Sequence, residues 1–181
     1  MAIVVDPDTD PEVIASHFEQ HGTLVGVTLS EGATRDELER IARAHAALDH
    51  GECVLDLVVV HPNADDSLLQ AVLDLAPDSS QVANSVATSP RVTEAILDRL
   101  SSSTLFGVRD HVTMARLEHE LARIEPDAFA DVLERFADHD TLGYGVRYRL
   151  ATHPRTPDAV LETIAAIADA TGEAARKRLG R

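Results

Sequence analysis

The residues with the clearest capacity for chemistry are His45, His50 and Cys53, which lie within nine positions of one another around Gly51. Imidazole nitrogen and thiolate sulfur both bind transition metals, so these three residues are candidate metal ligands. A lone cysteine followed by Val-Leu-Asp-Leu is, however, typical of a small side chain in a hydrophobic core. We therefore expect the three residues to be structural, and a metal-dependent enzyme is the last of three functions considered for the chain.

His17 and His21 form a second histidine pair, because residues four apart share one face of a helix. A protein zinc site uses about three or four ligands, and no third ligand lies at a recognisable spacing. Paired carboxylates such as Asp65 and Asp66 are not accompanied by a glycine-rich phosphate loop or a nucleophile elbow. The sequence therefore predicts no catalytic residues, no cofactor and no bound metal.

The net negative charge of the chain indicates which kinds of partner it can bind. Its 181 residues include 31 Asp and Glu against 16 Lys and Arg, for a net charge of −15. This charge repels a phosphate backbone, so nucleic-acid binding is not expected. No stretch approaches the roughly 18 apolar residues of a membrane span, and the N-terminus lacks the basic start of a signal peptide. We expect no membrane association and a cytoplasmic location.

A nine-residue pattern recurs along the chain and sets the elements that position all of these side chains. It opens at residues 6–14 (DPDTDPEVI), and five further copies end on a leucine: 30–38, 61–69, 89–97, 113–121 and 153–161. Proline at the second place ends the preceding helix, because it has no N–H and disfavours helical geometry in the residue before it. That proline is present in four copies, at Pro7, Pro62, Pro90 and Pro154.

Each block also carries the signals that start a new helix. Thr or Asp side chains two or three residues after the second place can accept hydrogen bonds from the free N–H groups of a first helical turn. The pairs Thr9 with Glu12 and Thr34 with Glu37 match the capping box. The block therefore predicts the end of one helix followed by the capped start of the next.

A shorter apolar segment precedes each of the later blocks. The segment at residues 54–60 (VLDLVVV) resembles a buried strand when taken alone. Its aligned counterparts carry apolar residues three to four apart, so we expect a short helix in each segment: 24–29, 54–60, 82–88, 105–112 and 142–152. Short helix, turn and capped longer helix then form a unit of about 24 to 31 residues, which must stack on its neighbours to bury its apolar faces.

The spacing between the last two blocks is longer, at 40 residues, and predicts an extra helix near residues 126–139. Phe129, Phe136 and Tyr144 place three of the six aromatic residues in this region. Aromatic side chains are enriched at interaction hot spots, so these three are candidate interface residues, with a role in the core as the alternative. We expect residues 1–181 to form one domain of about six repeats with a C-terminal capping helix.

The block at residues 153–161 (HPRTPDAVL), preceded by VRYRLAT, resembles the leucine-rich repeat variant family, whose block reads roughly Asn-Pro-Asn-Thr-Pro-Pro-Glu-Val-Leu. Residues 6–14, 61–69 and 89–97 resemble it as well. The family's first-position Asn is absent throughout, and Glu31 and Met114 replace the proline. The resemblance implies a HEAT-like, right-handed superhelix of helical repeats, a role in protein interaction, and no catalytic residues.

Together these observations predict an all-α protein, a right-handed α-solenoid. The expected function is that of a non-enzymatic scaffold that presents an acidic surface to a protein partner with a basic face. An acidic decoy that occupies the nucleic-acid-binding site of another protein is the alternative, motivated by the charge of −15.

Overall fold

The computed structural model describes residues 2–136 and 142–181. It is 64% helical, and the described residues contain eleven α-helices, one 3-10 helix and a single two-stranded sheet. The prediction of an all-α fold is confirmed. None of the helices in the described ranges is long and apolar enough to cross a membrane.

The chain divides into two compact units, Met1–Val112 and Thr113–Arg181, called here the N-terminal unit and the C-terminal unit. The boundary falls inside helix α7 (Val108–Arg123). This helix is continuous, so the helix end and helix start predicted for the block at residues 113–121 are wrong. The reason is local, because Met114 stands where Pro62, Pro90 and Pro154 each follow the end of a helix in other blocks.

The N-terminal unit begins with strands β1 (Ile3–Val5) and β2 (Val27–Leu29), joined by helix α1 (Pro11–His21). The strands pair in parallel, with Ile3 opposite Val27. The short helix predicted at residues 24–29 is therefore wrong. Burial alternates along β2, with Val27 and Leu29 buried and Thr28 exposed, which is the period of a strand covered on one face.

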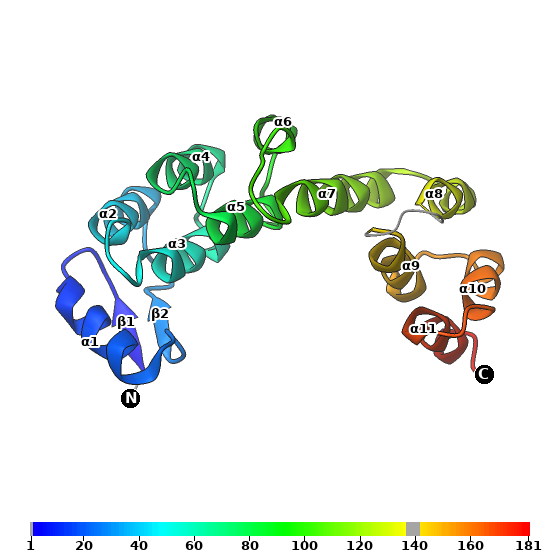
Figure 1. The fold of residues 1–181 in the computed structure, drawn as a ribbon, viewed down its shortest axis with the longest axis horizontal. Coiled ribbons are helices and arrows are strands. Elements are labelled where there is room, and N and C mark those ends of the chain that lie inside the picture. Colours follow the sequence, from blue (N-terminus) through cyan, green and yellow to red (C-terminus); the bar gives the residue numbers. More distant parts are fainter. Residues whose placement is uncertain (1, 137–141) are drawn as a thin grey trace. The chain divides into compact units, whose positions relative to one another are not determined.

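The rest of the N-terminal unit is helical. Its helices are α2 (Arg35–His45), α3 (Gly51–Val60), α4 (Asp66–Leu75), α5 (Ser80–Ala87) and α6 (Glu94–Ser101). Helix α2 packs beside α4, and α3 packs beside α5. Figure 1 shows α2, α4 and α6 in one row and α3 and α5 in another. The short helices predicted at 54–60 and 82–88 are confirmed, since they lie in or across α3 and α5.

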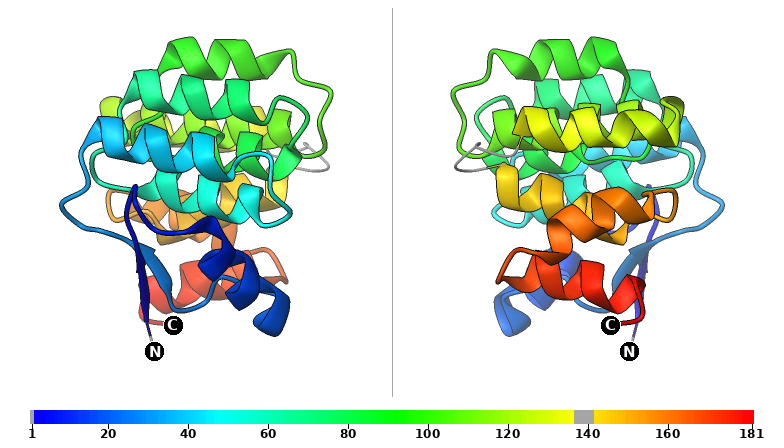
Figure 2. Two further views of the ribbon diagram at one scale, coloured as in Figure 1. Left: turned by 90° about the vertical axis from the view of Figure 1, so that its left-hand side faces the viewer. Right: turned by 90° about the vertical axis from the view of Figure 1, so that its right-hand side faces the viewer.

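The C-terminal unit contains the end of α7 and four further helices. After the 3-10 helix Pro126–Ala128 come α8 (Phe129–Phe136), α9 (Gly143–Thr152), α10 (Asp158–Ala165) and α11 (Ala170–Arg178). Helix α8 lies where the extra helix was predicted near 126–139, of which residues 137–139 lie outside the described ranges. Helix α9 packs against α8, α10 and α11 (Figure 2). The core of this unit includes Leu121, Phe129, Leu150 and Leu161.

Side-chain caps mark the start of several helices, including α1, α2, α4, α5 and α11, whereas α6 has no side-chain cap at Thr93. The capping box at Thr34 is confirmed, because the Glu37 N–H donates to Thr34 Oγ1 at 3.3 Å and the Thr34 N–H donates to Glu37 Oε2 at 2.8 Å. The box predicted for Thr9 is wrong. Asp10 caps α1 by accepting from the Glu12 N–H at 3.0 Å, and Thr9 Oγ1 instead accepts from the Asp6 N–H at 2.9 Å.

Five of the six blocks contain the same turn. The carbonyl of the first residue accepts from the N–H of the fourth at 2.9 to 3.1 Å, in the blocks that begin at residues 6, 30, 61, 89 and 153. In the four blocks with proline, the side chain of the first residue also accepts from the N–H of the third, the residues involved being Asp6, His61, Ser89 and His153. Any side chain with an acceptor at that reach serves there, which accounts for the variety of residue types at the first place.

Candidate functional site

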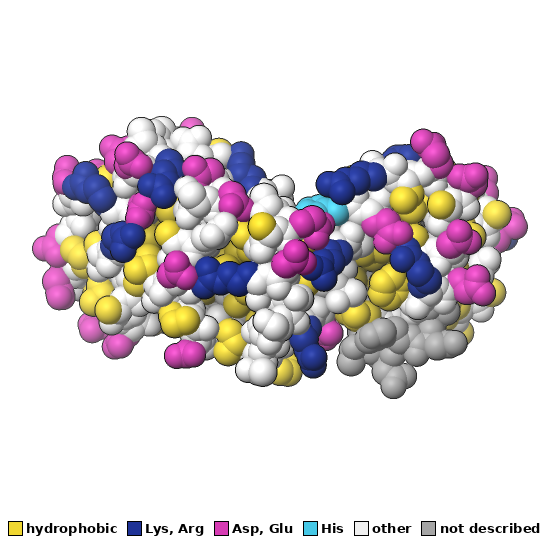
Figure 3. All heavy atoms as spheres, turned by 90° about the horizontal axis from the view of Figure 1, so that it is seen from above, with side chains coloured by type: hydrophobic (Ala, Val, Ile, Leu, Met, Phe, Trp, Pro, Cys, Tyr) yellow, Lys and Arg dark blue, Asp and Glu magenta, His cyan; other side chains and the backbone are white. Residues whose placement is uncertain are grey.

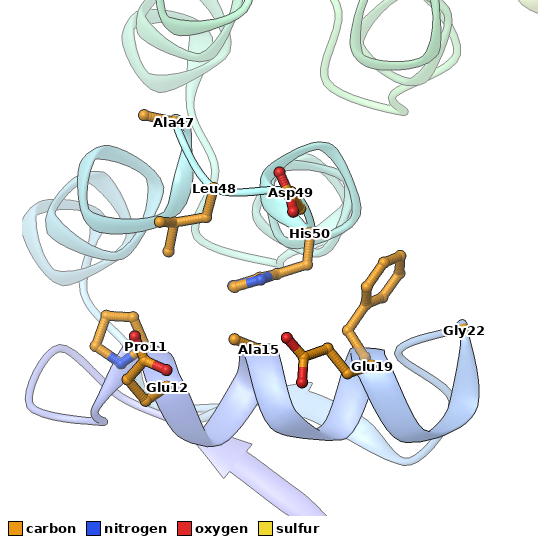
Figure 4. Close-up of a pocket in the computed structure, with 10 residues that line it drawn as sticks. Pro11, Glu12, Ala15, Glu19, Gly22, Ala47, Leu48, Asp49 and His50 are labelled. Atoms are coloured by element: carbon orange, nitrogen blue, oxygen red, sulfur yellow. The ribbon is translucent and has the colours of Figure 1, made fainter.

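An open cleft of about 610 Å³ lies between α1 and the connection from α2 to α3 (Figure 4). We call it the α1 cleft. The acidic residues Glu12, Glu19 and Asp49 line it, together with the apolar residues Ala15 and Leu48. The aromatic residue Phe18 and the histidine His50 also line the cleft.

The sequence of α1 places one wall of the cleft. Glu12, Ala15 and Glu19 follow one another at helical spacings of three and four residues, so they share a face. Ile14 lies on the opposite side and is fully buried in the core. Packing of Ile14 therefore turns the face with the two glutamates toward the cleft.

The other wall is a tight connection held by backbone hydrogen bonds. The Leu48 N–H donates to the His45 carbonyl at 2.9 Å, and the Gly51 N–H donates to the Leu48 carbonyl at 2.8 Å. A Cβ atom at Gly51 would lie 2.5 Å from the His45 carbonyl oxygen and 2.8 Å from that of Ala46. Only glycine fits this close approach of backbone to backbone.

The connection brings two buried histidines into direct contact. His45 Nδ1 and His50 Nε2 lie 2.9 Å apart, so one ring donates a proton and the other accepts it. Burial lowers the pKa of both rings. The neighbouring His50 lowers the pKa of His45 further, whereas Asp49 and Glu12 act in the opposite direction on His50. The pair is therefore neutral at neutral pH.

Of the predicted metal ligands, the structure brings His45 and His50 together. Cys53 is a half-buried free thiol in the first turn of α3. Within residues 2–136 and 142–181, no group of three or more His, Cys, Asp or Glu side chains is arranged to hold a metal ion. The cluster of three ligands that a metal-dependent enzyme would need is not formed by the described part of the chain.

The second histidine pair has a structural role. The rings of His17 and His21 lie 4.5 Å apart between centroids. His17 Nε2 donates to the Val25 carbonyl at 3.2 Å, which fastens α1 to the loop before β2. This contact depends on the fold and has no signature in the sequence.

Two of the three predicted interface aromatics are packed inward. Phe129 is 0% exposed and belongs to the core of the C-terminal unit, which is the alternative role considered for it. Its face of α8 also carries the buried Val132 and is turned toward α9. Phe136 is half-buried and packs against the same core.

Tyr144 is the aromatic residue of that set with an accessible ring. It is 47% exposed and stacks on Tyr148, which is exposed to the same extent, with ring centroids 6.3 Å apart and planes 13° from parallel. Tyr148 was missed as a candidate, although its spacing of four residues from Tyr144 would have placed both on one face of a helix.

The charge is distributed unevenly between the two units. The N-terminal unit holds 19 Asp and Glu against 6 Arg, for a net charge of −13, and the C-terminal unit holds 12 against 10, for a net charge of −2. In the face shown in Figure 3, acidic side chains are interspersed with basic and apolar ones. The net charge is therefore a property of the N-terminal unit, without forming one continuous acidic track on that face.

Several carboxylates of the N-terminal unit are paired, and those of the α1 cleft are not. Glu39 forms ion pairs with Arg35 and Arg43 on α2. Among the described residues, the side chains of Glu12, Glu19 and Asp49 have no ion pair and no hydrogen bond. The cleft thus gathers three carboxylates that no described side chain pairs with.

In comparisons with known proteins, no family model, no curated protein and no solved structure matches the chain.

Proposed function

We propose that the chain is a non-enzymatic interaction scaffold, an α-solenoid whose acidic N-terminal unit binds a protein partner through a basic face of that partner. The observation that carries this proposal is the net charge of −13 within Met1–Val112. Opposite charges steer two proteins together and fix their orientation, which raises the association rate. We place the chain in the cytoplasm and assign it no catalytic residue and no cofactor.

The contacts between successive turns support a stacked arrangement. His61 Nε2 donates to the Ser30 carbonyl at 3.0 Å, and Asn63 Nδ2 donates to the Ala33 carbonyl at 2.8 Å, so the third block is tied to the second. Arg91 Nη1 donates to the His61 carbonyl at 3.4 Å, which ties the fourth block to the third. A unit bonded chiefly to the unit before it is what a helical repeat array requires.

A similar contact recurs in the C-terminal unit, where Arg178 donates to the carbonyl of His153 in the last block. The likeness of residues 6–14, 61–69, 89–97 and 153–161 to the leucine-rich repeat variant block supports the same arrangement. A right-handed superhelix of such repeats, with interaction rather than catalysis as its role, is part of the proposal.

The test is affinity capture from the source cytosol with the full chain as bait, followed by binding measurements on the purified pair. We expect a reproducible protein partner with a basic face, and a Kd that rises with ionic strength as the charges are screened. If nothing reproducible is captured while the purified chain turns over a substrate, the scaffold proposal is wrong.

Two matched variants separate the contribution of each unit. The first variant replaces three exposed acidic residues of the N-terminal unit by their amides, namely Glu31, Glu52 and Asp78. The second replaces three exposed acidic residues of the C-terminal unit in the same way, namely Glu125, Asp127 and Glu173. Both variants therefore change the net charge equally. The first variant is expected to weaken binding more than the second. Equal effects would remove the N-terminal unit as the binding surface.

The acidic decoy makes a different prediction for the same partner. A decoy competes with duplex DNA for the partner's nucleic-acid site, so added DNA would displace the chain. The interspersed charges in Figure 3 do not follow a phosphate-like track on that face, and we expect DNA not to compete. Competition by DNA would replace the scaffold proposal with the decoy.

A further inference from the structure

We propose that the α1 cleft receives a long basic side chain, arginine or lysine, from the protein partner. This inference rests on the proposed function, because it identifies the part of the acidic unit that recognises the basic face.

The rim supplies charge of the required sign. Glu12 and Glu19 lie on one face of α1, two helical turns apart, and Asp49 lines the cleft from the α2–α3 connection. All three are exposed and are without an ion pair in the described part of the chain. A cation placed among them is partly withdrawn from water, where its attraction to a carboxylate is stronger than at an open surface.

The apolar lining of the cleft, here called its floor, consists of Ala15, Phe18 and Leu48 and suits the aliphatic part of such a side chain. Ala15 and Phe18 are half-buried, and Leu48 is exposed at the edge although it is apolar. Arg and Lys bury their methylene groups along apolar surface while the charged head stays at the polar rim. The Phe18 ring can also attract a cation through its π face.

His50 adds a buried polar group to this cleft. It is 2% exposed, and Figure 4 shows its ring pointing from the connection toward α1. Its Nε2 is occupied by His45, whereas its Nδ1 has no hydrogen-bond partner among the described residues. When His50 donates its Nε2–H to His45, Nδ1 is an acceptor.

Three carboxylates that only accept, joined by His50 Nδ1 in the tautomer in which it accepts, select for a ligand that only donates. Arg and Lys side chains carry several N–H donors and no acceptor, whereas Gln and Asn carry both. The chemistry of the lining therefore separates a basic side chain from a neutral polar one of similar length.

The test is NMR titration of the ¹⁵N-labelled full chain with Nα-acetyl-arginine amide and Nα-acetyl-lysine amide. Nα-acetyl-glutamine amide serves as the neutral comparison. We expect saturable shifts at the amides of Ala15, Glu19 and His50 with the two basic compounds and not with the glutamine compound. Equal binding of the glutamine compound overturns the proposal.

Matched variants test the rim and the floor separately. Glu12→Gln with Glu19→Gln should weaken binding of the arginine compound by about fivefold or more, the effect of losing two modest charge interactions. Glu31→Gln with Glu173→Gln makes the same change in net charge away from the cleft and should alter binding by less than about twofold. Ala15→Leu leaves the charge unchanged and should abolish binding by filling the floor, with circular dichroism used to verify that each variant is folded.

The outcomes also separate this inference from the proposed function. Equal weakening by the two charge-matched pairs would show attraction to the whole acidic unit and would overturn the cleft. If a captured partner binds the Glu12→Gln, Glu19→Gln variant as tightly as the parent chain, the cleft proposal falls and the scaffold stands. Saturable binding of the arginine compound in a chain that captures no partner would support the cleft and count against the scaffold.

Discussion

His61 and Ser30 lie 31 residues apart in the chain and are joined by a hydrogen bond of 3.0 Å from His61 Nε2 to the Ser30 carbonyl. The other ring nitrogen, Nδ1, accepts from the Asn63 N–H at 3.1 Å. Both partners dictate the same tautomer, a neutral ring with its proton on Nε2. One side chain thus shapes its own turn and fastens it to the turn of the preceding block.

This dual role gives a graded prediction for His61. His61→Ala removes both bonds at a buried position and should lower the free energy of unfolding by about 1 to 3 kcal/mol. His61→Asn keeps an acceptor for the Asn63 N–H but is too short to reach Ser30, so its loss should be smaller. Urea denaturation of the two variants checks the order, and an equal loss in both would show that only the bond to Ser30 matters.

Gly51 should tolerate no side chain. Gly51→Ala places a methyl group against the carbonyl oxygens of His45 and Ala46, so the α2–α3 connection must shift. Such overpacking typically costs about 1 to 3 kcal/mol, and here it should also separate the two histidine rings. The matched control is Gly32→Ala, because nothing lies within 4 Å of a Cβ atom at Gly32.

Comparison of the two glycine variants by thermal unfolding tests the prediction. We expect Gly51→Ala to melt several degrees lower than Gly32→Ala, since about 1 kcal/mol shifts the Tm of a domain of this size by about 2 to 4 °C. Equal melting temperatures would mean that the connection relaxes without cost.

Phe129 and Phe106 separate the roles of core and surface aromatics. Phe129 is 0% exposed, whereas Phe106 is 90% exposed. Phe129→Ala leaves a cavity among the core residues of the C-terminal unit and should cost about 3 to 5 kcal/mol. Phe106→Ala should change stability by less than about 0.5 kcal/mol.

Chemical denaturation measures both phenylalanine variants. A small loss for Phe129→Ala would restore that residue as a candidate for the interface. A large loss for Phe106→Ala would show that its ring makes contacts in solution that its exposure does not suggest.

The helix starts at Thr34 and Asp65 were predictable from the sequence, because their causes are local. Thr34 and Asp65 lie within three residues of the N–H groups that they cap, so both ends of each bond are visible in one short stretch. The parallel pairing of Ile3 with Val27 was not predictable in the same way. This pairing joins residues that lie 24 positions apart in the chain. The alignment of the repeats favoured a helix at 24–29, whereas the burial of Val27 and Leu29 in the folded chain favours a strand.

The candidate site was predictable only in part. The sequence groups His45 and His50 with Cys53 as candidate metal ligands. The contact between the two histidines depends on the close backbone approach at Gly51, which a spacing of five residues does not reveal. The α1 cleft combines residues 11–22 with residues 47–50, and only tertiary packing brings these segments together. The third place of the block holds Asn63 in one copy and Arg91 in the next, and both side chains donate hydrogen bonds to a carbonyl of the preceding block. Their shared capacity to donate was a signal in the sequence for these contacts.

The buried histidine pair should make stability depend on pH. The pKa of each ring is lowered in the folded chain, chiefly by burial, below the ordinary value of about 6.5 that applies to the unfolded chain. As the pH falls below about 7, the unfolded chain takes up protons that the folded pair excludes, so the free energy of unfolding decreases. Above about pH 7.5 the rings are neutral in both states and contribute no slope.

The double variant His45→Asn, His50→Gln tests this dependence. Asn reaches the place of a ring Nδ1 and Gln reaches the place of a ring Nε2, so the contact between residues 45 and 50 can persist without a titrating group. We expect a smaller drop in stability than in the parent chain between about pH 8 and about pH 5.5, measured by urea denaturation at each pH. A residual slope should remain, because burial also lowers the pKa of His153. Parallel slopes in the variant and the parent would show that the pair does not control the response to acid.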